Sequence, residues 1–278
     1  MSNSEMQWKD LSPLIPYVQN PSVLKNVRWA ENLGSTNDVL KAHPDAPHGT
    51  IVAADAQNAG KGRLGRSFFS PKDSGLYLSV LYRPAESRAL SSFVTMGACV
   101  AALEAVAKAC GVTPAIKWVN DLMIGPKKIA GILTESRADP NPERQFIVVG
   151  IGLNLFIPER GFPDEIADRA GSITGVTAKA YGERGGDPAD LRARLLAAMI
   201  DGLTALGRAR RPEPYAEIYR SHSNLVGRKV ILTGAGEPLP GTVIGFDRFG
   251  HLKLQDEGGS LRIITSGELT LRVQEPLR

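Results

Sequence analysis

Residues 117–135 read KWVNDLMIGPKKIAGILTE, and this stretch decides the fold. Short apolar runs on either side of the Gly125-Pro126 turn are typical of consecutive β-strands. They predict strands over Leu122–Ile124 and Lys128–Glu135, preceded by a strand over Ala115–Trp118. Lys117 lies among the apolar residues of that first strand, where an amine is costly to bury without an anionic partner. It must therefore reach solvent or meet a carboxylate or phosphate.

Further strands and helices surround this stretch on both sides. β-rich runs predict strands over Val27–Leu33, Thr50–Asp55, Leu76–Tyr82 and Phe146–Phe156. Apolar residues recur with helical periodicity across Ser87–Cys110, which predicts a long helix that ends at Gly111. Similar patterns predict helices over Pro188–Gly207 and Pro214–Ser221. These elements together predict an α+β fold, in which helices pack against a mixed β-sheet.

The pattern changes near Leu225. Five short strands separated by Gly, Pro and Asp turns, typical of a small barrel, are predicted over Lys229–Thr233, Gly241–Asp247, His251–Gln255, Leu261–Thr265 and Glu268–Val273. At the other end of the chain, residues 1–25 carry three prolines and little periodicity. We therefore expect an N-terminal extension over residues 1–25, a larger domain over 26–223 and a small barrel over 224–278.

Composition excludes several classes of protein. The 278 residues are 42% hydrophobic, enough for a buried core, and the net charge of +4 is too small for a dedicated nucleic-acid binder. Two cysteines without CxxC spacing and four scattered histidines argue against a disulfide scaffold or a zinc site. No secretory leader is apparent, and charged residues interrupt the most apolar stretch, Thr95–Cys110. We expect a cytoplasmic protein without a membrane span.

A basic, glycine-rich segment lies at Gln57–Lys72. It holds four cations and no acid, and its glycines allow the backbone to approach a ligand closely, as a polyphosphate site requires. Gly60, Gly62 and Gly65 match the GxGxxG spacing of dinucleotide-binding loops, but such loops lead directly into a helix. Here a loop and a strand follow, which argues against that fold. Considered alone, the segment is equally compatible with a solvated basic loop.

Three other segments carry polar or glycine-rich patterns. Asn120 and Asp121 supply hard oxygen ligands of the kind that hold Mg²⁺ beside a nucleotide, although a hairpin with a polar turn would contain the same residues. The glycines of Val149–Leu155 leave room for a flat ligand against a strand. The segment Gly34–Asn37 predicts a helix start at which Ser35 and Thr36 accept hydrogen bonds from unpaired backbone N–H groups.

Five of these motifs occur in a specific order along the chain. They are Gly34–Asn37 (an S-T-N element), Gly60–Gly65 (a G-R-G-R-x-G loop), Lys117–Leu122 (K-W-P-N-D-L), Ile129–Glu135 (an A-G-I-L-x-E strand) and Gly150–Asn154 (G-I-G-x-N). In this order they resemble the biotin protein ligases, enzymes that adenylate biotin and transfer it to a carrier lysine. The resemblance covers Val27–Leu155, and the C-terminal strands are similar to the family's SH3-like domain.

The resemblance implies a fold and an activity. The fold is a class II synthetase-like biotin/lipoate ligase catalytic domain followed by an SH3-like β-barrel. The activity consumes ATP and biotin with Mg²⁺, releases pyrophosphate, and attaches biotin to a lysine of a biotin carboxyl carrier protein, such as a subunit of acetyl-CoA carboxylase. A homodimer is possible, and neither nucleic acid nor a membrane is expected as a partner.

The resemblance also implies roles for individual residues. The expected catalytic residues are Lys117, between the biotin carboxylate and the α-phosphate, and Arg63. The expected biotin-binding residues are Ser35, Thr36, Asn37, Gln57, Gly60, Lys61, Arg63, Lys117, Leu122 and Gly150. The expected ATP-binding residues are Lys61, Gly62, Arg63, Arg66, Phe68, Lys117, Asn120, Asn154 and Arg272. Asn120 and Asp121 are the expected metal ligands. We therefore expect Lys117 and the loop of residues 60–66, which would act as a mobile lid, to face one cavity.

Two departures from the family pattern and three alternative functions are relevant. Lys61 replaces the usual arginine, which keeps the charge and loses the bidentate fork, and Val119 replaces the usual proline.

A lipoate protein ligase is disfavoured because its R-R-x-S/T-G-G-G-A-V-x-H run is absent. A biotin-responsive repressor is disfavoured because residues 1–25 are too few for a winged helix. A non-catalytic biotin-binding regulator would not need Lys117.

Overall fold

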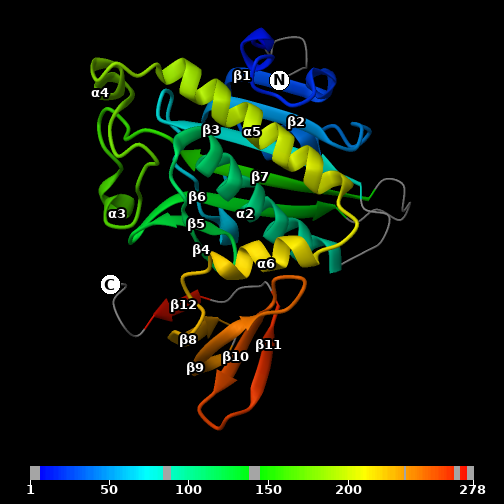
Figure 1. Ribbon diagram of the computed structural model, residues 1–278, viewed down its shortest axis with the longest axis vertical. Helices are drawn as coiled ribbons and strands as arrows, with labels where there is room; N and C mark the ends of the chain where they lie inside the picture. The colour runs from blue at the N-terminus through cyan, green and yellow to red at the C-terminus, as the bar shows by residue number, and fades with distance from the viewer. Residues whose placement is uncertain (1–6, 84–88, 138–144, 235, 266–269, 274–278) are drawn as a thin grey trace.

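The computed structural model describes residues 7–83, 89–137, 145–234, 236–265 and 270–273. A seven-stranded mixed sheet forms its centre, in the order β1-β2-β3-β7-β6-β5-β4 (Figure 1). The β1–β2 pair is parallel and the other neighbours are antiparallel. The strands are β1 (Val27–Leu33), β2 (Thr50–Gln57), β3 (Gly75–Tyr82), β4 (Ala115–Lys117), β5 (Asp121–Ile124), β6 (Lys127–Arg137) and β7 (Phe146–Asn154). All seven were predicted from the sequence, with ends displaced by a few residues.

Two long helices, α2 (Ala89–Cys110) and α5 (Pro188–Arg208), lie across one face of this sheet (Figure 1). Gly97 of α2 allows the two helices to approach closely, because a Cβ at this position would lie only 2.3 Å from Leu206 Cδ1 of α5. Within the described residues, Ser92–Cys110 alone is long and apolar enough to cross a membrane by those two criteria, and most of it is buried in the fold. Its apolar composition reflects burial between the sheet and α5. Helix α6 (Glu213–Ser221) continues this layer toward the C-terminal domain (Figure 1).

The opposite face of the sheet carries a smaller core. Helix α1 (Thr36–Lys41) packs there through Leu40, against a cluster that includes Val52, Leu81 and Val148. Because α1 has only 6 residues, it covers only part of this face. Two short helices, α3 (Asp164–Ala167) and α4 (Ala178–Glu183), follow β7 at one end of the sheet and were not predicted from the sequence (Figure 1).

The N-terminal residues form an ordered part of the structure. Residues 7–26 contain two 3-10 helices, η1 (Ser12–Leu14) and η2 (Pro21–Asn26). Trp8 forms an antiparallel bridge with Ala30, and the Lys9 backbone N–H donates to Trp29 O at 2.6 Å, so this segment adds to the free edge of β1. The weak sequence periodicity here is explained by 3-10 turns, which show no helical stripe.

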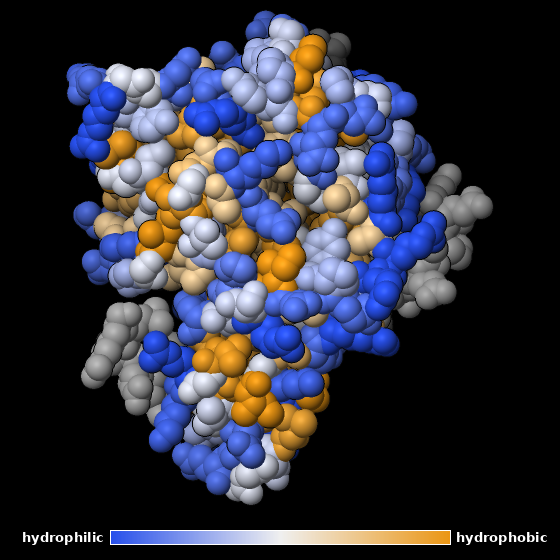
Figure 2. Space-filling view, in the orientation of Figure 1, coloured by the Kyte–Doolittle hydropathy of each residue, from blue (hydrophilic) through white to orange (hydrophobic). Residues whose placement is uncertain are grey.

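A second, five-stranded antiparallel sheet forms the C-terminal domain, in the order β11-β10-β9-β8-β12. Its strands are β8 (Lys229–Gly234), β9 (Gly236–Phe246), β10 (Leu252–Asp256), β11 (Leu261–Ile264) and β12 (Thr270–Val273). All five strands were predicted, although Ser266–Leu269 lie outside the described residues. Ile244, Leu261 and Ile263 are exposed here, and Figure 2 shows apolar side chains on the visible surface of this domain.

The C-terminal domain is fixed to the central sheet by buried contacts. Trp118 Nε1, directly after β4, donates to Gly250 O at 2.9 Å. The rings of Tyr219 in α6 and Phe246 in β9 meet edge to face, with centroids 5.1 Å apart. These contacts connect the small domain directly to the strand that carries Lys117.

A buried carboxylate connects the N-terminal segment, the sheet and α5. Asp55 on β2 is 5% exposed and lies 2.7 Å from Lys9 Nζ. It also accepts from Trp29 Nε1 at 3.0 Å, and the Arg192 guanidinium of α5 lies 3.8 Å away. Because buried ions are costly without partners, these residues stabilise the fold only as a group.

We expect Asp55→Ala to lower the free energy of unfolding by about 3 kcal/mol, because it leaves the buried Arg192 guanidinium without an acid. Urea unfolding followed by circular dichroism measures this loss. Glu31→Ala is the matched control, since Glu31 is exposed and 3.7 Å from Lys72. Its expected change is below about 0.5 kcal/mol. Equal losses in the two variants would show that the Asp55 group does not stabilise the fold.

Candidate functional site

A cavity of about 360 Å³ lies on the sheet face that carries α1. Lys117 and the loop of residues 60–66 both line it, so these two sequence segments meet at one site. The predicted site residues that line the cavity are Ser35, Thr36, Asn37, Gln57, Lys61, Gly62, Arg63, Arg66, Phe68, Lys117, Asn120, Asp121, Gly150 and Asn154.

Three predicted site residues do not line this cavity. Gly60 lies at the base of the glycine-rich loop and borders a neighbouring groove. Leu122 is fully buried in the large core, so it is not in contact with a ligand in the cavity. Arg272 pairs with Ile231 in the C-terminal sheet, and its side chain lies outside the described residues.

Residues 60–68 form a tight hairpin. Phe68 N–H donates to Gly60 O at 2.9 Å, Gly62 N–H donates to Arg66 O at 2.7 Å, and Lys61 and Ser67 form an antiparallel bridge. A Cβ at Gly60 would lie 2.4 Å from Phe68 O, so only glycine allows the two arms to close. The hairpin leads through a loop into β3 with no α-helix after the glycines, which is inconsistent with a dinucleotide-binding loop.

Phe68 anchors this hairpin to the sheet. Gly131 on β6 and Gly152 on β7 are register partners, and a Cβ at Gly152 would lie 2.5 Å from Phe68 Cε1. The Phe68 ring also meets Tyr77 edge to face, with centroids 6.3 Å apart. The expectation that the glycines of β7 leave room for a flat ligand is therefore wrong at Gly152, because a side chain of the protein occupies that room.

The same correction applies at Gly150. A Cβ there would lie 2.2 Å from Asn37 Oδ1, so Gly150 allows the amide of α1 to reach the strand. The glycines of β7 thus admit one side chain from the hairpin and one from α1. Both side chains line the cavity that they help to shape.

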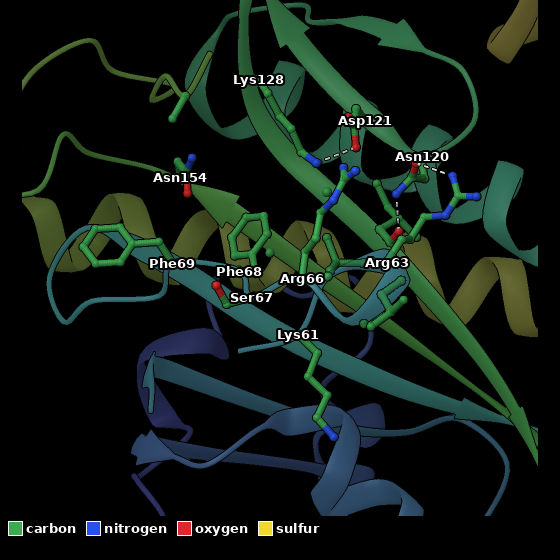
Figure 3. A pocket seen from close by; sticks show the side chains of 18 of the residues that line it. Lys61, Arg63, Arg66, Ser67, Phe68, Phe69, Asn120, Asp121, Lys128 and Asn154 are labelled. Carbon is green, nitrogen blue, oxygen red and sulfur yellow. Dashed lines mark hydrogen bonds and ion pairs between the residues drawn. The ribbon is translucent and has the colours of Figure 1, made fainter. Parts of the chain in front are cut away.

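The turn between β4 and β5 holds the hairpin from the other side. Asn120 Nδ2 donates to Ile132 O at 2.7 Å, which orients its Oδ1 to accept from Arg63 Nη1 at 3.2 Å (Figure 3). Burial lowers the pKa of the Arg63 guanidinium, the charge of Arg66 acts in the same direction, and the Asp121 carboxylate opposes both. Asp121 forms an ion pair with Lys128 at 2.6 Å. The peptide bond between Trp118 and Val119 is cis.

Two lysines of the site differ in their partners. Lys61 Nζ lies 2.6 Å from Asp38 Oδ1 on α1, and Figure 3 shows this side chain directed away from Arg63 and Arg66. Lys117, which is half-buried, makes no hydrogen bond or ion pair with any residue that the structure describes. Its amine is thus available to an anion in the cavity.

Polar side chains at the start of α1, together with Gln57, form one end of the cavity, which we call the polar end. Gln57 Oε1 accepts from the Thr36 backbone N–H at 2.8 Å and lies 3.1 Å from Thr36 Oγ1. The Ser35 side chain makes no capping hydrogen bond. The predicted cap by Ser35 and Thr36 is therefore wrong, because a residue 21 positions away in sequence caps the helix instead.

Residues 162–170 form a wall of the cavity that was not predicted from the sequence. Phe162, Ile166, Arg169 and Ala170 line the cavity, as does Lys128. Lys128 N–H donates to Arg169 O at 2.7 Å, which joins this wall to β6. The segment mixes apolar residues with three acidic residues and one basic residue, and no motif in it could have placed it at the site.

The oxygen atoms near the hairpin do not form a metal site by themselves. No group of three His, Cys, Asp or Glu side chains suited to a metal ion occurs within the described residues. Asn120 Oδ1 and the Asp121 carboxylate already face Arg63 and Lys128. A Mg²⁺ ion at this place would need most of its ligands from water and from a bound polyphosphate.

Comparison with known proteins gives a consistent picture. Residues 29–154 match the model of the biotin/lipoate A/B protein ligase family, and residues 225–272 match that of the biotin protein ligase C terminal domain. A biotin--[acetyl-CoA-carboxylase] ligase of Paracoccus denitrificans is 32% identical over 242 residues, 84% of this chain and 96% of that protein.

Two further similarities extend this comparison. A bifunctional ligase/repressor of Bacillus subtilis is 38% identical over 133 residues, 48% of this chain, and the chain spans only 41% of the length of that relative. The structure of a biotin protein ligase from Aquifex aeolicus in complex with biotin and ATP has a TM-score of 0.70 and 28% identity, and the match covers 90% of this chain and 100% of that chain.

We expect Gly152→Ala to displace the Phe68 ring and so to loosen the hairpin. Overpacking of this kind costs about 1.4 kcal/mol, which corresponds to roughly tenfold faster tryptic cleavage after Lys61, Arg63 or Arg66. Mass spectrometry of timed digests measures the rate. Gly182→Ala is the control, since a Cβ there meets nothing within 4 Å. Equal cleavage rates in both variants would show that Phe68 does not anchor the hairpin.

Proposed function

The chain belongs to the biotin protein ligases of the biotin/lipoate A/B protein ligase family, and from this premise we propose that it joins biotin to ATP and transfers it to a carrier lysine. In the first step a carboxylate oxygen of biotin bonds to the α-phosphorus of ATP. The bond from that phosphorus to the β-phosphate oxygen breaks, and pyrophosphate leaves with the electron pair. The product is biotinyl-5'-AMP.

In the second step the neutral amine of a carrier lysine bonds to the acyl carbon. The bond from this carbon to the phosphate oxygen breaks, AMP leaves, and the amine loses a proton. The proposed partner is a biotin carboxyl carrier protein. A cytoplasmic location, the possible homodimer and the absence of a nucleic-acid partner remain predictions from the sequence.

The observation that supports this proposal best is the position of Lys117. Both reactants of the first step are anions, so the site must cancel their repulsion. Lys117 lines the same cavity as Arg63 and Arg66, and it forms no ion pair with an acidic side chain among the described residues. We assign it the position between the biotin carboxylate and the α-phosphate. No general base is needed, because the carboxylate is already ionised.

The two ends of the cavity suit the two substrates. The polar end at Ser35, Thr36 and Gln57 matches the ureido head of biotin, which carries both N–H donors and a carbonyl acceptor. The other end has the Phe68 ring and the Asn154 amide (Figure 3), together with Phe162, Ile166 and Arg169 from the wall of residues 162–170. An aromatic face beside one amide is suited to adenine.

Arg63 and Arg66 are the proposed contacts to the phosphates. Arg63 is held by Asn120, and Arg66 lines the cavity without an acidic partner in the described part of the chain. Magnesium enters as part of the substrate, bound to ATP, where it neutralises phosphate charge. Asn120 and Asp121 are the proposed oxygen groups on the protein side, and the phosphates supply the remaining ligands.

We expect Lys117→Ala to lower biotin-dependent exchange of pyrophosphate into ATP by about a thousandfold. One charge at ~4 Å is worth about 4 kcal/mol at an effective dielectric constant of 20, which corresponds to that factor when the charge acts in the transition state. Lys179→Ala, on the exposed surface of α4, is the control and retains wild-type exchange. Near-wild-type exchange by Lys117→Ala would refute the role assigned to this lysine.

Arg63 and Lys61 are expected to differ in effect although they lie in one hairpin. Arg63→Ala should lower kcat/KM for ATP by about 100-fold, the scale of a lost charge-assisted contact to phosphate. Lys61→Ala should lower it less than about threefold, since its amine forms an exposed ion pair with Asp38. Initial-rate measurements at varied ATP test both. A loss in Lys61→Ala as large as that in Arg63→Ala would place the Lys61 amine on the phosphates.

A further inference from the structure

Four side-chain oxygen atoms at the polar end of the cavity lie in a row, and they have fewer hydroxyl protons than the row has oxygen–oxygen contacts. Ser79 Oγ on β3 lies 2.5 Å from Asn37 Oδ1 and 2.7 Å from Thr36 Oγ1. Thr36 Oγ1 in turn lies 3.1 Å from Gln57 Oε1. Only the two hydroxyl groups carry protons, whereas the row has three contacts between oxygen atoms. One contact therefore has no proton.

Glu135 on β6 fixes where one of these two protons goes. Its Oε1 accepts from Lys41 Nζ and its Oε2 from Asn37 Nδ2, both at 2.7 Å. An ionised carboxylate only accepts hydrogen bonds, so the Asn37 amide must turn its Nδ2 to Glu135 and its Oδ1 to Ser79. Asn37 Oδ1 then requires the Ser79 proton, and the Thr36 proton can go either to Ser79 Oγ at 2.7 Å or to Gln57 Oε1 at 3.1 Å. We assign it to the shorter of these two contacts.

The contact without a proton is then the one between Thr36 Oγ1 and Gln57 Oε1. It is the longest of the three contacts. Gln57 cannot relieve it by turning its amide, since its Oε1 already accepts from the Thr36 backbone N–H at 2.8 Å. Both residues line the cavity, so two acceptor oxygens lie side by side there.

We propose that Glu135 is a remote specificity determinant, which sets the hydroxyl direction along Asn37, Ser79 and Thr36 so that Thr36 and Gln57 present a paired acceptor to a ligand N–H. This inference rests on the proposed function, in which the ligand is a cyclic urea with two N–H groups. A carboxylic acid substrate whose ring has no N–H donor leaves the two acceptor oxygens unsatisfied, so the site rejects it. Glu135 is a positioning residue, because its carboxylate bonds only to Asn37 and Lys41 among the residues that the structure describes.

Glu135→Gln reverses the direction of the whole row. Lys41 keeps its ion pair with Asp38, and because an ammonium group only donates, it contacts the oxygen and not the nitrogen of the introduced amide. The nitrogen of that amide therefore faces Asn37. The Asn37 amide then turns its Nδ2 to Ser79, the Ser79 proton moves to Thr36, and the Thr36 proton fills the contact with Gln57. Every contact in the row is then satisfied, so the variant is expected to fold, but the paired acceptor is lost.

The test measures the affinity of the wild type and the variant for biotin by calorimetry and their KM for biotin by pyrophosphate exchange. Two biotin analogues, each with one ureido N–H replaced by a ring oxygen, are measured in the same way. We expect the wild type to prefer biotin over one of the two analogues by at least about tenfold. In Glu135→Gln this preference should fall below about threefold, with a roughly tenfold higher KM for biotin and kcat within about threefold.

Two further variants make the test specific. Ser79→Ala interrupts the row at its middle, so it should reduce the preference as Glu135→Gln does, and the double variant should lose no more than either single one. It also carries the test if Glu135→Gln does not fold. Lys41→Gln removes the same ion pair but keeps the Glu135 carboxylate on Asn37, and it should retain the wild-type preference.

The outcomes separate this inference from the proposed function. If the KM for biotin and for the analogues rises in parallel in Glu135→Gln, Glu135 only supports the structure and the inference is wrong. A loss of preference in Lys41→Gln equal to that in Glu135→Gln would assign the effect to the ion pair and also overturn it. A wild-type chain that does not bind biotin would overturn the proposed function together with this inference.

Discussion

The structure depends on one electrostatic constraint: positive charge must face the cavity without being neutralised by acids of the same chain. Three carboxylates near the cavity are each bound to a specific lysine. Asp38 pairs with Lys41 and Lys61, Glu135 with Lys41, and Asp121 with Lys128. Lys117 and Arg66, by contrast, have no acidic partner among the described residues that line the site. A net charge of only +4 is therefore compatible with a strongly cationic site, because the acids are held by specific ion pairs.

Close packing of side chains on bare backbone is the second constraint. Gly150 and Gly152 are two residues apart on β7, so both face the side of the sheet that carries the cavity. Gly131 of β6 is the register partner of Gly152. Asn37 and Phe68 occupy the space that a Cβ would fill at these two positions of β7. The hairpin and α1 are thereby fixed to the same two strands. The distance between the polar end of the cavity and its aromatic end is then set by the sheet, which is the most rigid element available.

The sequence predicted the parts of this arrangement that depend on local patterns. All seven strands of the central sheet and the helices α2, α5 and α6 follow from periodicity. The meeting of Lys117 with residues 60–66 was predicted from the resemblance to the biotin protein ligases, since the cost of burying an amine requires only an anion or solvent near Lys117. Contacts between distant residues were not accessible in this way. Gln57 replaces Ser35 as the cap of α1, Asp38 takes the Lys61 amine, and residues 162–170 close the cavity, in each case because the tertiary fold brings together segments that no local pattern connects.

The C-terminal domain is connected to the turn after Lys117 both directly and through α6. Lys117 is the last residue of β4, and Trp118 beside it donates its indole N–H to Gly250 of the small domain. The Tyr219 hydroxyl of α6 donates to Val119 O at 3.0 Å, and Tyr219 also packs on Phe246 of β9. Asn120, next in sequence, holds Arg63. Of four consecutive residues, Lys117 thus lines the cavity, and Trp118, Val119 and Asn120 contact the small domain, α6 and the hairpin, respectively. The position of Lys117 relative to Arg63 and to the small domain is therefore set in part by this one turn.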